Sequence, residues 1–234
     1  KGYRILIMGK SILTTKQLDF LELAQAQPSI TKKFYLTGGT ALSEFYFQHR
    51  LSEDIDLFTE KEEVNPKAVE SFLQAMSKQL GISKIIKQNY LGLYTYKLQY
   101  KDGEQLKIDF NYYPFPKVET GVYFKKLEVS SIYDIAVNKI HTVTMRSKAR
   151  DYIDLYLIFK QANYPPAEYL QKIRLDSQAK FDWPLENKNL VAALLKVKDL
   201  KDEDFPKMLI PFDKNEMEKF FLNLAKSLEN GIFK

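Results

Sequence analysis

The stretch from residue 35 to residue 59, YLTGGTALSEFYFQHRLSEDIDLFT, decides the fold that we expect for this chain. The short apolar segment 34–36 predicts a buried strand, which the pair Gly38-Gly39 ends. The amphipathic segment from about residue 41 to residue 48 predicts a helix, and the apolar residues in segment 54–58 predict a second strand. The order is therefore strand, turn, helix and strand.

The turn has a composition that suits phosphate binding. Gly38 and Gly39 can adopt positive φ angles, which lets a ligand approach the backbone closely. Thr40 is placed to cap the following helix, whose free N–H groups and dipole favour an anion such as a phosphate. An ordinary strand-to-helix turn is the alternative, and a Gly-Gly pair taken alone favours it.

The second strand carries two carboxylates. Asp54 and Asp56 lie two residues apart, so they point to the same face of a strand. Two ionised carboxylates on a buried strand repel each other and lose hydration, and a bridging divalent cation relieves both costs. A set of oxygen ligands suits Mg²⁺ or Mn²⁺. Two acids that face water at a strand end are the alternative, but the nearby Gly-Gly-Thr turn favours a metal site.

A third carboxylate is expected from Asp109, in the strand-like segment 105–112. Segments 82–88 and 93–100 also predict strands, and the turn at Asp102-Gly103 predicts a hairpin that brings Asp109 into the sheet of the DID strand. Three carboxylates with two cations suit nucleotidyl transfer, because one cation activates the attacking hydroxyl and the other holds the triphosphate and leaving pyrophosphate. Asp109 is then the candidate to help deprotonate the nucleophile. An edge-strand acid facing solvent is the alternative.

Lysines are scattered over the same predicted strands. Alternation along a strand makes them a solvated outer face first and a nucleic-acid patch second. The set comprises Lys84, Lys87, Lys97, Lys101 and Lys107.

Two parts of the chain resemble a known family. Residues 38–42 (GGTAL) and 49–58 (HRLSEDIDLF) look like the signature of the AbiEii/AbiGii toxin family, within the DNA polymerase beta-type nucleotidyltransferase superfamily. Lys139, Arg146 and residues 150–156 (RDYIDLY) resemble its downstream motif, so that the resemblance spans about residues 34–159. It implies the toxin of a bacterial toxin–antitoxin or phage-defence pair, with an antitoxin as partner. Because some relatives modify tRNA, it also implies tRNA or another RNA as acceptor.

Lys139 and Arg146 are candidates to contact the triphosphate. Lys139 lies on the apolar stripe of a predicted helix that ends near residue 145, and Arg146 follows on the same face. A cationic side chain that faces the core without a partner is costly to bury, and binding to a phosphate would compensate this cost. Snorkelling or an ion pair with Asp151 is the alternative, and the resemblance favours phosphate binding. Asp154 is expected to orient these cations, and Asp151 either to orient them or to assist proton transfer.

Composition is consistent with a cytoplasmic protein. The chain has 234 residues, no cysteine, 45% hydrophobic and 14% aromatic residues, which suits one large domain or two small ones. No apolar run approaches the ~20 residues of a membrane span, and the apolar segment 5–8 is too short for a signal-peptide core. The net charge of +5 suits a polyanionic partner but is too small to establish one.

We therefore expect an α+β fold, in which a nucleotidyltransferase-like mixed sheet with flanking helices (residues 1–129) precedes a helical C-terminal region (130–234). Its expected activity is metal-dependent transfer of a nucleotidyl group from an NTP to an acceptor hydroxyl. A small-molecule or protein acceptor, or a non-catalytic nucleotide-binding protein of the same fold, is the alternative. Further helices are expected at 14–26, 66–80, 149–161, 167–175, 187–196 and 214–230.

Overall fold

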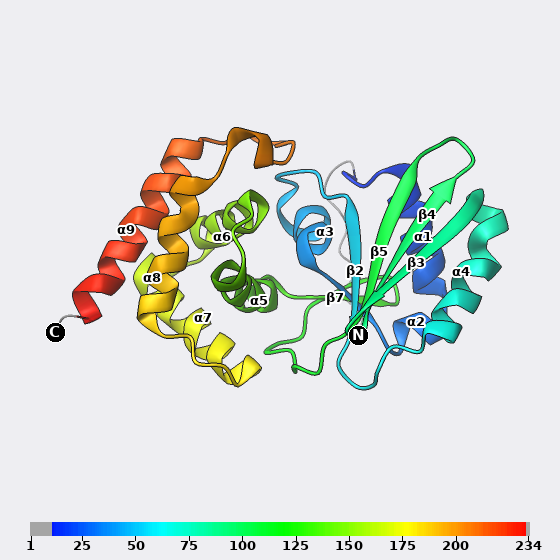
Figure 1. The fold of residues 1–234 in the computed structure, drawn as a ribbon, viewed down its shortest axis with the longest axis horizontal. Coiled ribbons are helices and arrows are strands. Elements are labelled where there is room, and N and C mark those ends of the chain that lie inside the picture. The colour runs from blue at the N-terminus through cyan, green and yellow to red at the C-terminus, as the bar shows by residue number, and fades with distance from the viewer. Residues whose placement is uncertain (1–10, 233–234) are drawn as a thin grey trace. The chain divides into compact units, whose positions relative to one another are not determined.

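A computed structural model describes residues 11–232 of the chain (Figure 1). The chain divides into two compact units. The first unit holds the residues up to Pro116 together with Thr120–Ser131, and the second holds Lys117–Glu119 and the residues from Ile132 onward. The apolar segment 5–8, considered above as a signal-peptide core, lies outside the described residues.

The first unit is built on a mixed seven-stranded sheet, which confirms the expected fold class. The strand order is β3-β4-β5-β2-β1-β7-β6. Strand β1 pairs antiparallel with β2 and parallel with β7, while β2 pairs parallel with β5. The strands are β1 (Tyr35–Thr37), β2 (Asp54–Thr59), β3 (Ile82–Tyr90), β4 (Leu93–Tyr100), β5 (Gln105–Tyr112), β6 (Val122–Phe124) and β7 (Leu127–Val129).

The register between β2 and β5 places the charged residues together. Asp54 lies opposite Lys107, and Asp56 lies opposite Asp109. Because side chains alternate along a strand, all four project from one face of the sheet. The alternate positions, which point to the other face, are fully buried and apolar: Ile55, Leu57, Ile108 and Phe110.

The helices of the first unit cover both faces of the sheet. Figure 1 shows α1 (Thr15–Ala26) and α4 (Pro66–Leu80) on one side and α3 (Gly38–Leu42) on the other, and the short α2 is Pro28–Thr31. Helix α4, expected at residues 66–80, has a cap at each end: the Asn65 side chain accepts a hydrogen bond from the Ala68 N–H, and Gly81 ends the helix with φ +70°. The local sequence therefore sets the ends of α4.

The helix expected at residues 41–48 is different in the structure. Helix α3 begins at Gly38, ends at Leu42 and continues as a π-helix, η1 (Ser43–Phe47). Thr40 is therefore inside the helix and is not its cap, because Gly38 at φ +74° turns the chain directly from β1 into the helix. The Thr40 hydroxyl donates instead to the backbone carbonyl of Asp54, which ties α3 to the start of β2.

The second unit is helical, as expected for the C-terminal part of the chain. Among residues 11–232, no helix combines the length and apolar character that a membrane span requires. The buried Tyr152 hydroxyl donates to the Ala193 carbonyl at 2.7 Å, and its ring packs edge-on against Phe221. The helices are α5 (Ile132–Met145), α6 (Ala149–Gln161), α7 (Pro166–Phe181), α8 (Asn187–Leu195) and α9 (Lys214–Ile232), with the short 3-10 helices η2 (Lys196–Asp199) and η3 (Asp202–Asp204).

A buried ion pair attaches residues 117–119 to the second unit. The carboxylate of Asp134 accepts hydrogen bonds from the Val118 N–H at 2.8 Å and the Glu119 N–H at 3.1 Å. Lys180 donates to the same carboxylate at 3.0 Å, and its side chain is only 2% exposed. The Asp134 carboxylate, on α5, therefore binds both the Lys180 ammonium group of α7 and the backbone of residues 117–119.

We predict that Lys180→Met lowers the free energy of unfolding by about 3 kcal/mol, because it leaves the buried carboxylate of Asp134 without its ammonium partner. Urea denaturation followed by circular dichroism measures this change. Lys188→Met is the matched control, since Lys188 pairs with Glu186 at the surface. A loss no larger than that of the control would show that the Asp134 contact does not stabilise the fold.

Candidate active site

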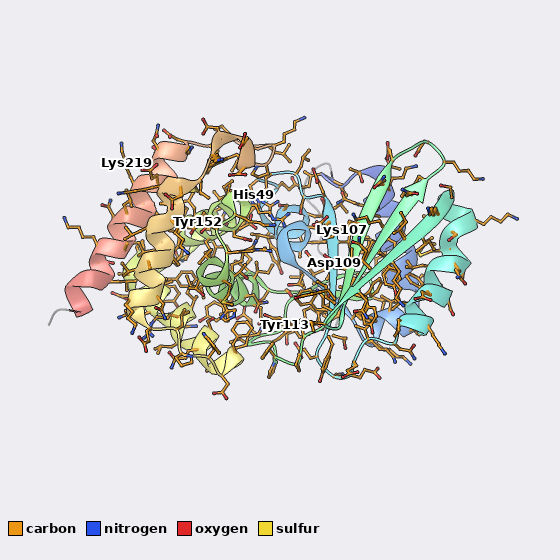
Figure 2. All side chains as sticks on the ribbon, viewed as in Figure 1. His49, Lys107, Asp109, Tyr113, Tyr152 and Lys219 are labelled. Atoms are coloured by element: carbon orange, nitrogen blue, oxygen red, sulfur yellow. The ribbon has the colours of Figure 1, made fainter. Side chains whose placement is uncertain are left out.

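The first unit brings the three predicted carboxylates together on one sheet face. Figure 2 labels Lys107 and Asp109, whose side chains belong to β5. Lys107 Nζ lies 2.6 Å from Asp109 Oδ2 and 3.2 Å from Asp54 Oδ2, so its ammonium group bridges two strands. The second oxygen of Asp109, Oδ1, accepts a hydrogen bond from the Thr95 hydroxyl at 2.5 Å. Asp109 is therefore held from both sides, and it is buried instead of facing solvent at a sheet edge.

Lys107 was wrongly expected on a solvated outer face. It lies two residues before Asp109 on β5, so it shares the face of the carboxylates. Burial lowers the pKa of Lys107, but the hydrogen bonds and charges of Asp109 and Asp54 outweigh burial and raise it above 10.5. The i, i+2 spacing of Lys107 and Asp109 in the sequence could have predicted that Lys107 belongs to the carboxylate cluster.

The Gly-Gly pair is required by two side chains that pack against it. A Cβ atom on Gly38 would lie 2.2 Å from Asp56 Oδ2, and one on Gly39 would lie 2.4 Å from Arg50 Nη2. The glycines therefore allow α3 to approach the DID strand and the buried Arg50. The role of Gly38, Gly39 and Thr40 in holding phosphates stays a prediction.

The donor chemistry of this face suits a divalent cation, although the side chains are not arranged around one. Their donor atoms are carboxylate oxygens, which Mg²⁺ and Mn²⁺ prefer. A cation already lies between Asp54 and Asp109 in the form of the Lys107 ammonium group. Within residues 11–232, no three His, Cys, Asp or Glu side chains are arranged as a metal site, and the two oxygens of Asp109 are bound to Thr95 and Lys107.

The second unit brings together the predicted residues of the downstream motif. Lys139 Nζ lies 2.7 Å from Asp151 Oδ1 and 2.6 Å from Asp154 Oδ2, and its side chain is 10% exposed. Arg146 Nε lies 3.0 Å from Asp151 Oδ2, and the Arg146 side chain is 46% exposed. Lys139 is thus ion-paired and does not snorkel to the surface. Both aspartates contact it, and the contact with Asp151 is the ion pair named above as the alternative to phosphate binding. The triphosphate contact and the orienting roles stay predictions.

Asp151 has a perturbed pKa. Burial would raise the pKa of its carboxyl group, but the charges and hydrogen bonds of Lys139 and Arg146 outweigh burial and hold it below the usual 3.8. The carboxylate is therefore ionised at neutral pH, and it serves as the common acceptor for both cations.

We predict that Gly38→Ala destabilises the protein more than Gly92→Ala. Both glycines have positive φ, +74° and +81°, so alanine costs roughly 1 kcal/mol of backbone strain at each. Only at Gly38 does the new Cβ meet a side chain, that of Asp56, which adds about 1–3 kcal/mol. Urea denaturation of the two variants measures the difference, and equal losses would refute the close approach of α3 to Asp56.

We predict that Asp151 stabilises the second unit only above acid pH. A carboxylate whose folded pKa lies below its unfolded pKa contributes stability that is fully present above about 3.8 and is lost as the pH falls through the folded value. The difference in unfolding free energy between wild type and Asp151→Asn should therefore be large at pH 6 and shrink below pH ~4. Urea titrations at several pH values measure it, and a difference independent of pH would contradict the ion pairs.

Known proteins share this fold. JHP933 from Helicobacter pylori superposes with a TM-score of 0.52 and 21% identity over 94% of both chains. The nucleotidyltransferase toxin MenT4 from Mycobacterium tuberculosis superposes with a TM-score of 0.53 and 14% identity, over 92% of this chain and 86% of MenT4. At these identities the likeness shows the fold alone. No curated protein sequence matches the chain.

A family profile matches nearly the whole chain. The profile of the family described as "Nucleotidyl transferase AbiEii toxin, Type IV TA system" matches residues 22–229. The match confirms the resemblance seen in the motifs and extends it past residue 159, into the helices that carry no recognised motif. Membership in a toxin family of type IV toxin–antitoxin systems implies a nucleoside triphosphate substrate and an antitoxin. The chain belongs to the AbiEii nucleotidyl transferase toxin family and is a nucleotidyltransferase.

Proposed function

We propose that the protein transfers a nucleoside monophosphate from an NTP to an acceptor hydroxyl with divalent cations, Mg²⁺ or Mn²⁺, held by Asp54, Asp56 and Asp109. One observation carries this proposal: a cationic group already bridges Asp54 and Asp109, at 3.2 and 2.6 Å. The register of β2 and β5 supports it further, because it sets Asp56 directly opposite Asp109. When bound, the cations would lower the pKa of the acceptor hydroxyl and stabilise the charge of the triphosphate and of the leaving pyrophosphate.

Asp109 is the proposed proton acceptor. The acceptor oxygen attacks the α-phosphorus, the bond to the bridging oxygen of pyrophosphate breaks, and the hydroxyl proton passes to the Asp109 carboxylate. Thr95 donates to Oδ1 of Asp109, which orients the carboxylate for this role. Gly38, Gly39 and Thr40 are proposed to hold phosphates of the NTP through their backbone N–H groups, because they lie at the start of α3 and the first N–H groups of a helix favour an anion.

Lys139 and Arg146 are the proposed triphosphate contacts, with Asp151 and Asp154 as positioning residues. The family match supports this, because Lys139 and Arg146 belong to the segment that resembles the family's downstream motif, and Asp151 and Asp154 both bind the Lys139 ammonium group. Arg146 shares Asp151 and remains 46% exposed, so its guanidinium can reach a ligand. We accordingly propose that residues 1–129 are the nucleotidyltransferase core and that residues 130–234 are a helical C-terminal region.

An RNA hydroxyl, first of all that of tRNA, is the proposed acceptor. The net charge of +5 supports a polyanionic partner, because such a partner releases counterions when cationic side chains bind its phosphates. We place the reaction in the cytoplasm, where NTPs and RNA are both abundant, and we propose a cognate antitoxin as the regulatory partner.

We predict that the purified protein transfers label from an NTP to total tRNA in the presence of Mg²⁺, and that Asp54→Asn reduces the transfer to background. The reason is that Asp54 is a proposed ligand of the cations. Asp19 is an exposed aspartate on α1 and is not a proposed ligand. Asp19→Asn is therefore the matched control and should keep wild-type activity. Incorporation is measured with each of the four labelled NTPs on denaturing gels.

The same assay separates the alternatives. Label in protein or in a small molecule, but not in RNA, would refute the RNA acceptor and keep the nucleotidyl transfer. Full activity of Asp54→Asn, or activity unaffected by chelation of divalent cations, would refute the metal-dependent mechanism.

A further inference from the structure

Lys107 has no part in the reaction as proposed so far, although it contacts two of the three proposed metal ligands. Its ammonium group lies 2.6 Å from Asp109 and 3.2 Å from Asp54. These two residues are proposed metal ligands on neighbouring strands, and Lys107 contacts one oxygen of each. The ammonium group therefore occupies the place between them that a bridging cation needs.

The sheet itself does not favour a lysine at this position. Lys107 lies directly opposite Lys97 on β4, and like charges in such a cross-strand pair repel each other. Lys87, on the edge strand β3, instead pairs at 2.6 Å with Glu70 at the surface. Lys107 is thus held where it is by the carboxylates on β2 and β5 and not by its strand neighbours.

We propose that Lys107 is a resident counter-ion that competes with the divalent cation for Asp54 and Asp109, so that the metal enters only as the ammonium group leaves. This inference deepens the proposed function and rests on it. It assigns Lys107 as a positioning residue, which keeps the two carboxylates close together in the metal-free protein.

Charge and flexibility make the exchange feasible. A divalent cation carries two positive charges and an ammonium group only one, so the carboxylates of Asp54 and Asp109 attract the divalent cation more strongly. The Lys107 side chain is 36% exposed and has a flexible four-carbon stem, so it can turn toward solvent when a divalent cation displaces it. The side chain of Asp109, at 11% exposed, stays in place, held by Thr95.

The test measures Mn²⁺ binding to the nucleotide-free protein by isothermal titration calorimetry and by electron paramagnetic resonance. Lys107→Met keeps the length of the stem and removes the charge, so it should bind Mn²⁺ about tenfold or more tightly than wild type. Lys97→Met is the matched control: it removes the same charge from the opposite position on β4 without removing the bridge. It should tighten binding by much less. Asp54→Asn, alone or combined with Lys107→Met, should abolish binding.

Thermal unfolding supplies an independent readout. Without metal, Lys107→Met should melt below wild type, because it loses the contacts of the ammonium group with Asp54 and Asp109. Mn²⁺ should raise the melting temperature of Lys107→Met more than that of wild type, because no ammonium group has to be displaced. Circular dichroism at low temperature confirms that each variant is folded.

Two results would overturn the inference in distinguishable ways. If wild type binds Mn²⁺ through Asp54 but Lys107→Met binds it no more tightly, or Lys97→Met gains as much, then Lys107 is no competitor and the metal-dependent function stands. If neither wild type nor Lys107→Met binds Mn²⁺, the proposed metal site fails, and the role of Lys107 fails with it.

Discussion

Charge compensation on the carboxylate-bearing face of the sheet is the constraint on which the first unit depends. The parallel pairing of β2 with β5 concentrates Asp54, Asp56 and Asp109 on one face, where their repulsion needs a cation. Lys107 supplies one, and Thr95 binds the oxygen of Asp109 that Lys107 does not. The opposite face of the same strands is apolar and fully buried, so this pair of strands cannot shift its register by one residue without burying the carboxylates in the core.

The surrounding elements are shaped by the same cluster. The glycine at position 38 leaves room for the Asp56 carboxylate, and the Thr40 hydroxyl binds the backbone carbonyl of Asp54. Helix α3 is therefore a support for the DID strand as much as a candidate for phosphate binding. The π-helix Ser43–Phe47 that follows it lengthens this support, and π-helical segments often occur at functional sites.

The second unit also pairs lysines with aspartates, and these ion pairs are more deeply buried. Lys139 is bound by two aspartates that are at most 1% exposed, and Asp134 pairs with an equally buried Lys180. Such pairs hold helices in one arrangement, because breaking either one leaves an uncompensated buried charge. Lys107, by contrast, is partly exposed, so the same kind of contact can open at modest cost. The buried ion pairs of Lys139 and Lys180 are thus suited to stabilising the fold, whereas the partly exposed ion pair of Lys107 is suited to exchange with a metal ion.

The sequence by itself determined the elements whose signals are local. Caps and turn residues such as Asn65 and Gly81 set the bounds of α4, the i, i+2 spacing put Asp54 and Asp56 on one face, and the motifs led to the correct family. Strands β6 and β7 were missed because each has only three residues and, unlike the equally short β1, neither is an apolar run that a Gly-Gly pair ends. Only the tertiary structure decided which strand pairs with β2, that Lys107 lies between two aspartates, and that Lys139 is held by both Asp151 and Asp154. These contacts join residues whose proximity depends on strand register and helix packing, which are set by the free energy of the whole core and not by neighbours along the chain.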